Sequence, residues 1–136
     1  VAIGDDGNPV ISYYDSTNED LELYVCANAA CSTGTNVELV TSGDVGQYTS
    51  VVIGVGGNPV IAYQDLGNVD LELYVCANAA CSTGTNVELV TSGDVGLYAS
   101  IAIDDGGNPV IPHFDNTNGD LKFARVKMPV TGIAYQ

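Results

Sequence analysis

Three short loops of the chain carry the side chains best suited to bind a metal ion. Each has the pattern D-x-x-N-x-D and offers two carboxylates and an amide oxygen, hard ligands that suit Ca²⁺. The loop residues are Asp15, Asn18 and Asp20, then Asp65, Asn68 and Asp70, then Asp115, Asn118 and Asp120. Hairpin turns favour the same residues, because Asp and Asn side chains bond to nearby backbone and tolerate positive φ. Since the EF-hand spacing is absent, we predict turns here, with calcium as the alternative and no other cofactor.

Four cysteines form two copies of the motif C-A-N-A-A-C, at Cys26/Cys31 and Cys76/Cys81. A metal site with this spacing would need further thiols or imidazoles, and His113 is the only histidine. We therefore predict one local disulfide in each motif, which would stabilise the fold by about 2 kcal/mol on the chain-entropy model. Disulfides would place the protein in an oxidising compartment, extracellular or at a cell surface.

Five tyrosines lie in the repeated part of the chain. They are Tyr14, Tyr24, Tyr48, Tyr74 and Tyr98. An aromatic ring with a polar tip suits packing between sheets, and it also suits stacking on a sugar in a lectin-like site. We predict packing and keep sugar stacking as the alternative.

The sequence predicts that the chain is not an enzyme. Its acids recur in repeated turns, whereas catalysis needs one asymmetric, preorganised site. His113 stands where Tyr13 and Tyr63 stand, which indicates a packing position for an aromatic-sized side chain. No serine lies in a nucleophile elbow, and no glycine-rich phosphate loop precedes a helix.

All of these residues belong to a repeat of fifty positions. Residues 20–46 and 70–96 are the same string, and residues 100–124 align with 49–74 as a third, partial copy. A fixed period of this size is typical of repeat proteins, in which one unit cannot bury its apolar face alone. We divide the chain into units 1–49, 50–99 and 100–136.

Each repeat predicts four short antiparallel strands and no helix. In the middle copy, period-two alternation between Gly, Asn, Asp and Pro clusters indicates strands near 50–53, 60–64, 71–76 and 86–91. Four such strands form the pattern of a β-propeller blade, whose two apolar faces each need a neighbouring sheet at about 10 Å. We predict an all-β fold of three blades per chain, with a linear β-repeat stack or fibre as the alternative.

Three blades do not make a closed propeller, since rings usually have four to eight. Either the chain is a fragment or a second chain completes the set, and non-closing association would give a filament. Because the chain lacks an initiator Met and a signal-peptide pattern at Val1, we expect it to be a trimmed or excised piece of a longer protein.

The third repeat departs from the other two. Val126 replaces the first cysteine, the shorter stretch 126–132 replaces the cysteine loop, and 132–136 is expected to supply a fourth strand. Terminal repeats commonly cap the array or contact a partner. We interpret this repeat as a cap or joining segment, and its three basic residues are candidate assembly residues: Lys122, Arg125 and Lys127.

The charge balance limits the partners. Seventeen acidic residues stand against three basic ones, and residues 1–120 carry no Lys or Arg. This argues against nucleic acid and anionic membrane surfaces as partners. No apolar run approaches the eighteen residues needed to span a bilayer, so we also expect no membrane insertion.

One combination of motifs covers nearly the whole chain. It consists of Ser100–Ile103, Asp105–Ile111, Phe114–Leu121 and Ala124, together with the paired cysteines and the motif G-D-V-G-x-Y-x-S at 43–50 and 93–100. In this combination the chain resembles a type of secreted bacterial β-propeller repeat. The resemblance implies blades of a large extracellular or cell-surface protein, and it carries no catalytic residue.

These observations predict a non-enzymatic, extracellular structural module that associates blade to blade with copies of itself, as a ring or a filament. The alternative is a lectin-like propeller that binds a glycan or another cell-surface protein.

Overall fold

The computed structural model describes residues 1–129, and these residues form only β-structure and turns. The eleven strands are β1 (Ala2–Ile3), β2 (Pro9–Asp15), β3 (Asp20–Cys26), β4 (Gly34–Val40), β5 (Val45–Ile53), β6 (Pro59–Asp65), β7 (Asp70–Cys76), β8 (Gly84–Val90), β9 (Ala102–Ile103), β10 (Pro109–Asp115) and β11 (Asp120–Arg125). No helix that could cross a bilayer is found among residues 1–129. The prediction of an all-β fold is confirmed.

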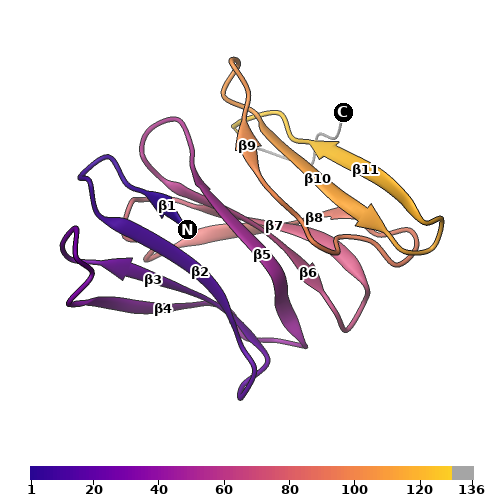
Figure 1. Ribbon diagram of the computed structural model, residues 1–136, viewed down its shortest axis with the longest axis horizontal. Helices are drawn as coiled ribbons and strands as arrows, with labels where there is room; N and C mark the ends of the chain where they lie inside the picture. Colours follow the sequence, from indigo (N-terminus) through magenta and orange to yellow (C-terminus); the bar gives the residue numbers. More distant parts are fainter. Residues whose placement is uncertain (130–136) are drawn as a thin grey trace.

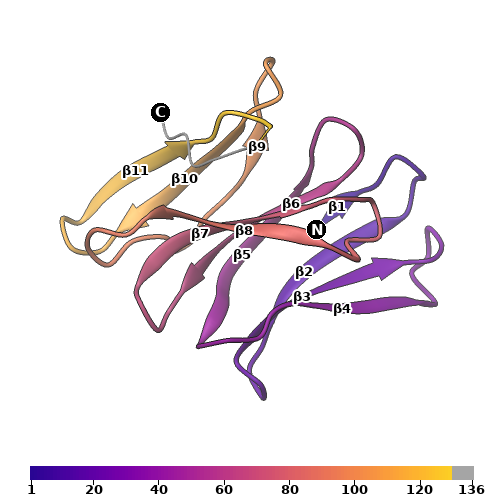
Figure 2. The same cartoon turned by 180° about the vertical axis from the view of Figure 1, so that it is seen from behind.

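The strands form three antiparallel sheets in the order of the sequence. The first sheet contains β1–β4, the second β5–β8 and the third β9–β11, and each strand pairs with its neighbours along the chain. The sheets stand side by side, with the second between the other two (Figures 1 and 2). None of the three sheets closes on itself. The stretch 132–136, where a fourth strand of the third repeat was expected, lies outside the described residues.

Two predicted strands of the middle repeat need correction. The first strand was expected at 50–53, but β5 begins at Val45, because Val45 already pairs with Asp65. The ladder between these points is interrupted where Gly46 (φ 100°) and Tyr48 (φ 50°) adopt left-handed backbone. The fourth strand, expected at 86–91, is β8 from Gly84 to Val90. In the first copy of S-G-D-V-G, at 42–46, Val45 and Gly46 therefore belong to β5, whereas the second copy, at 92–96, lies outside the named strands.

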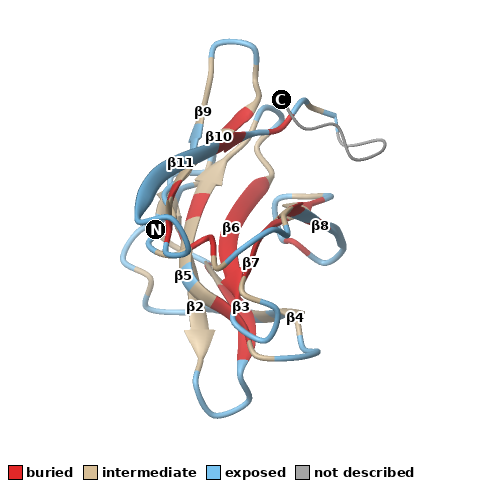
Figure 3. Ribbon diagram, turned by 90° about the vertical axis from the view of Figure 1, so that its right-hand side faces the viewer, coloured by how far each residue is buried: buried red, intermediate tan, exposed pale blue. Residues whose placement is uncertain are grey.

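The second sheet is covered on both faces (Figure 3). Every residue of β6 is buried. Val60 and Ala62 pack in the core shared with the third sheet, whereas Ile61 and Tyr63 pack in the core shared with the first sheet. Successive side chains of a strand point to opposite faces, so β6 serves two cores at once.

Glycine at the start of β5 is required by close packing. A Cβ atom on Gly46 would lie 2.7 Å from Cα of Leu21 in the preceding sheet, and φ there is +100°. Gly96 occupies the same position one repeat later, and a Cβ atom there would lie 3.0 Å from Cα of Leu71. Only glycine allows this backbone approach. The segments around Gly46 and Gly96 therefore approach the preceding sheet in the same way at both junctions.

Candidate association surfaces and polar clusters

Both predicted disulfides are present. Cys26 bonds to Cys31, with the Cα atoms 4.9 Å apart, and Cys76 bonds to Cys81, with the Cα atoms 4.8 Å apart. Each bridge closes the connection between the third and fourth strands of its sheet. Cys76 and Cys81 are buried against the first sheet, whereas Cys31 is partly exposed. The bridges indicate an oxidising environment.

The D-x-x-N-x-D loops are tight hairpin turns whose side chains bond within the turn. In the first repeat, Oδ1 of Asp15 accepts from the backbone N–H of Thr17 (2.8 Å), and Oδ2 accepts from Nδ2 of Asn18 (2.9 Å). The backbone hydrogen bond to Thr17 lowers the pKa of Asp15. Asp65 accepts from Asn68, and Asp115 from Asn118, in the same way.

These turn bonds account for the recurring Asp and Asn residues. The remaining acids of the motif, Asp20, Asp70 and Asp120, begin the following strand. No cluster of three His, Cys, Asp or Glu side chains suited to hold a metal ion occurs within residues 1–129. Calcium stays an untested alternative.

A polar cluster with two buried members, Tyr63 and Glu72, lies between the first and second sheets. The hydroxyl of Tyr63 donates to Oε2 of Glu72 and lies 2.6 Å from Oδ1 of Asn86, and Nδ2 of Asn86 donates to the same Oε2 at 2.7 Å. Tyr63 and Glu72 are directly opposite each other on β6 and β7. Burial raises the pKa of both groups, and the hydrogen bond to Glu72 raises that of Tyr63 further.

The first sheet carries the same cluster without a covering sheet. Its members are Tyr13, Glu22 and Asn36. The hydroxyl of Tyr13 donates to Glu22, and this bond raises the pKa of Tyr13 to about 12. Tyr13 is partly exposed, whereas Tyr63 has no exposed surface. The tyrosine of this arrangement is therefore buried in the second repeat and partly exposed in the first, whereas Glu22 and Glu72 are equally buried.

In the third sheet, different residues occupy the two strand positions of this cluster. His113 is buried, as its predicted packing role requires, and its Nδ1–H donates to the carbonyl oxygen of Ile111 at 3.2 Å. Burial lowers the pKa of His113. Lys122 pairs with Asp115 at 2.6 Å and holds the pKa of that carboxyl at about 2.

The recurrent tyrosines take several roles. Tyr14 donates to Oδ1 of Asp44 at 2.8 Å, and Tyr74 packs against the core between the first two sheets. Tyr48 and Tyr98 form an edge-to-face pair with ring centroids 4.6 Å apart, and both have positive φ. Tyr98 also lines a shallow, mainly apolar hollow of about 260 Å³ with Pro112, Phe114 and Leu121.

The outer face of the third sheet, which we call the C-face, is apolar and open. It is formed by Val110, Pro112, Phe114, Leu121 and Phe123, which alternate with residues that face the second sheet. Leu121 is 79% exposed, whereas Leu21 and Leu71 at the same repeat position have no exposed surface. Phe123 is 67% exposed, and its equivalents Leu23 and Leu73 are fully buried. The C-face therefore consists of positions that are core elsewhere in this chain.

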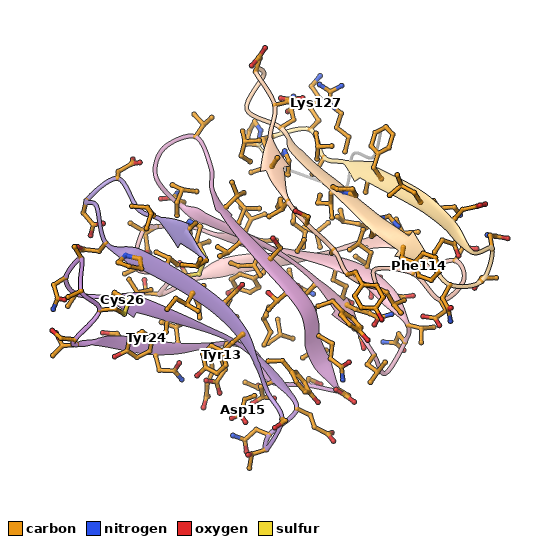
Figure 4. The ribbon with its side chains drawn as sticks, in the orientation of Figure 1. Tyr13, Asp15, Tyr24, Cys26, Phe114 and Lys127 are labelled. Carbon is orange, nitrogen blue, oxygen red and sulfur yellow. A yellow bond between two sulfur atoms is a disulfide. The ribbon has the colours of Figure 1, made fainter. Side chains whose placement is uncertain are left out.

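The outer face of the first sheet, which we call the N-face, is its counterpart. It is formed by Val1, Ile3, Ile11, Tyr13 and Tyr24. Ile11 and Tyr13 are partly exposed, although Ile61 and Tyr63 at the same positions are buried. Val1 and Ile3 are largely exposed. Figure 4 shows labelled residues of the two outer sheets, Tyr13 and Tyr24 on the first and Phe114 on the third, at opposite ends of the molecule.

The three basic residues lie in different surroundings. Lys122 points toward the buried side of its sheet through its ion pair with Asp115. Arg125 pairs with Oδ2 of Asp104 and is about half exposed. Lys127 is exposed and lies beyond β11, near the β9–β10 turn (Figure 4). Of these candidates, Arg125 lies beside the C-face, directly opposite Val110 on the neighbouring strand.

Sequence reasoning missed the Tyr–Glu–Asn clusters and the ion pair between Arg125 and Asp104. A signal for the first existed, because Tyr63 and Glu72 are placed opposite each other by a hairpin centred on 67–68. The ion pair joins β11 to the turn before β10, and no spacing rule within one strand predicts such a contact.

Comparison with protein families finds no family that matches the chain, and comparison with curated proteins finds no relative.

Proposed function

We propose that the chain is a non-enzymatic structural module of an extracellular or cell-surface protein, whose sheets act as β-propeller-type blades and associate with copies of the same chain. Such association would give a ring or a filament. The observation that carries the proposal is the exposure of Leu121 and Phe123 at positions that are fully buried in both preceding repeats. The repeat is built to be covered, and the third sheet is not covered by residues 1–129.

The hydrophobic effect favours this association. Burying one leucine or phenylalanine side chain stabilises an assembly by about 1.5–3 kcal/mol. The C-face offers Leu121 and Phe123 together with Val110, Pro112 and Phe114, and the N-face offers aliphatic and tyrosine side chains that are core in the second repeat. Large exposed apolar patches of this kind mark interaction sites on proteins.

The disulfides support the proposed compartment. Both cysteine pairs are bonded and no cysteine is free among the described residues. Stable disulfides are typical of secreted and cell-surface proteins and rare in a reducing cytosol. The strongly acidic composition favours solubility of a repeat protein with open strand edges.

Sedimentation velocity over a wide concentration range tests the proposal. We expect the chain to form dimers or longer assemblies, and we expect Phe123→Asp to make it monomeric. Val55→Asp is the matched control, because Val55 is 80% exposed in a turn and the equivalent positions already hold Asp5 and Asp105. A wild-type chain that stays monomeric at every concentration would contradict the proposal.

A glycan-binding module is the second candidate, supported by one observation. Tyr98 is 67% exposed and lines the apolar hollow on the C-face, where a sugar ring could stack. A glycan array that shows tight binding, inhibited by free sugar and lost in Tyr98→Ala, would favour this function. The same result with a monomeric chain would replace the structural proposal.

A further inference from the structure

The two internal junctions of the protein bring the same repeat positions together. A crevice of about 220 Å³ between the first and second sheets is lined by Val25 from one side and Gly56 from the other. The equivalent crevice between the second and third sheets, of about 300 Å³, is lined by Val75 and Gly106. Each junction therefore places the penultimate residue of the third strand near the turn before the second strand of the next sheet.

The same positions at the two ends of the molecule hold opposite charges. One repeat beyond Val25 and Val75 stands Arg125, and one repeat before Gly56 and Gly106 stands Asp6. A further sheet stacked on the C-face as the second sheet stacks on the first would bring its Asp6 to the crevice that Arg125 lines. Valine and glycine occupy these two positions at both internal junctions, whereas a base and an acid occupy them at the ends. Asp5 and Asp6 line the first crevice from the first sheet's own turn.

The side chains at the two ends of the molecule are compatible with this contact. Arg125 is about half exposed and is held at the edge of the C-face by Asp104. Its guanidinium has five N–H donors, so it can bind a second carboxylate. Asp6 is exposed in the turn before β2.

The overall charge distribution favours the same direction. The first sheet and its turns carry no Lys or Arg, whereas all three basic residues of the chain lie between 122 and 127. Pairing two N-faces would bring acidic residues together, and pairing two C-faces would bring Arg125 against Arg125. Opposite charges across an interface select the partner and its orientation.

We infer that copies of this chain join head to tail, with the C-face of one copy against the N-face of the next and Arg125 of one copy paired with Asp6 of the other. The inference rests on the proposed function and adds the orientation and the residue pair that specifies it. A contact between unlike faces is heterologous, so it produces a ring when the rotation closes and a filament when it does not.

Two charge-reversal variants test the pairing by mixing. Arg125→Asp places an acid at both ends of the chain, and Asp6→Arg places a base at both ends. Each variant alone then has like charges at every head-to-tail contact, whereas a mixture of the two restores an acid–base pair at every contact between unlike copies. We expect each variant alone to associate at least about tenfold more weakly than wild type, and the equimolar mixture to recover wild-type association.

Sedimentation velocity at low salt provides the measurement, since screening weakens exposed charge pairs. Glu88→Arg is the control for Asp6→Arg, because it makes the same charge change at an exposed position on β8, away from Arg125 and Asp6. Circular dichroism of each variant checks that its fold is retained. If Arg125→Asp unfolds because it loses the ion pair with Asp104, Arg125→Gln replaces it, and we then expect Arg125→Gln alone to associate more weakly than wild type.

The outcomes separate the two proposals. Wild-type chains that never associate contradict the proposed function itself. Wild-type chains that associate while either reversal variant associates equally well, or while the mixture stays as weak as its components, contradict the pairing and its direction and leave the structural function standing.

Discussion

Replacing the same leucine by alanine in successive repeats gives the sharpest test of how the sheets stabilise one another. Leu71 has no exposed surface and packs in the core between the second and third sheets. Leu121 stands at the same repeat position on the C-face and is 79% exposed. The two substitutions are chemically identical, on the same strand of the repeat, so any difference between them reports the presence of a covering sheet.

The expected magnitudes differ widely. Truncating a buried leucine removes its transfer free energy and leaves a cavity, which costs about 2–5 kcal/mol of the free energy of unfolding. With a urea dependence of about 1–3 kcal/mol/M for a chain of this size, Leu71→Ala lowers the unfolding midpoint by about 1–2 M. Leu121→Ala removes little buried surface from the single chain and changes its free energy of unfolding by less than about 0.5 kcal/mol.

Urea unfolding followed by circular dichroism, at a protein concentration low enough to keep the chain monomeric, measures both values. Leu21→Ala in the first sheet should resemble Leu71→Ala, because Leu21 is also fully buried. At high concentration, Leu121→Ala should weaken self-association instead. A monomeric Leu121→Ala chain as unstable as Leu71→Ala would refute the reasoning, since its cost would then arise within the chain and not from a missing sheet.

Three further predictions address other parts of the structure. Burial raises the pKa of Glu72 above its ordinary value of 4.5, so its neutral form stabilises the folded state fully below about pH 4.5, and that contribution is lost as the pH rises through the raised pKa. Glu72→Gln should therefore gain stability relative to wild type as the pH rises from acidic to neutral. A stability difference that is independent of pH would contradict this. Gly46→Ala should destabilise the protein by well over the cost of left-handed backbone, about 1–2 kcal/mol, because its Cβ would lie 2.7 Å from Cα of Leu21. Gly7→Ala has nothing within 4 Å of its Cβ and should cost only the backbone strain. Equal losses of melting temperature in the two variants would exclude close packing as the cause. Cys76→Ala/Cys81→Ala should cost more than Cys26→Ala/Cys31→Ala, where loop closure alone contributes about 2 kcal/mol, because the second bridge also fills the core between the first two sheets; a larger loss for the first bridge in urea unfolding would count against this reading.

Much of the fold could be predicted from the sequence because turn residues mark the ends of the inner strands in each repeat. The second and third strands of the middle repeat, expected at 60–64 and 71–76, are β6 and β7 within one residue at either end. Pro59 and the glycine turn before it set the start of β6, and the Asp65–Asn68 turn sets its end. Both cysteine bridges were predicted, because five positions separate the two thiols of each motif and the chain offers too few further ligands for a metal site.

The edges of the repeat were less predictable. Gly46 and Tyr48 interrupt the period-two alternation, so the first strand was expected only from 50, although Val45 already pairs with Asp65 in β5. The identical sequences of β3 and β7 also gave no indication that their surroundings on the tyrosine side differ. Tyr13 and Tyr63 occupy the same position, yet one lies on an open face and the other under a sheet.

The candidate association surfaces follow from stacking order rather than from local sequence. Leu121 occupies the repeat position of the buried Leu21 and Leu71, and it is exposed because its sheet is the last of the three. The contact between Arg125 and Asp104 joins residues twenty-one positions apart through a hairpin and a turn, so spacing alone does not reveal it. The relation between Arg125 and Asp6 became visible only in the structure, because the crevices at the two internal junctions show which repeat positions meet.

An image of the associated particle by electron cryomicroscopy tests the central claim most directly. The account predicts that the third sheet of one copy lies on the first sheet of the next, at the spacing and orientation that relate consecutive sheets within the chain. Particles in which copies meet through other surfaces, with Leu121 and Phe123 still facing solvent, would contradict it.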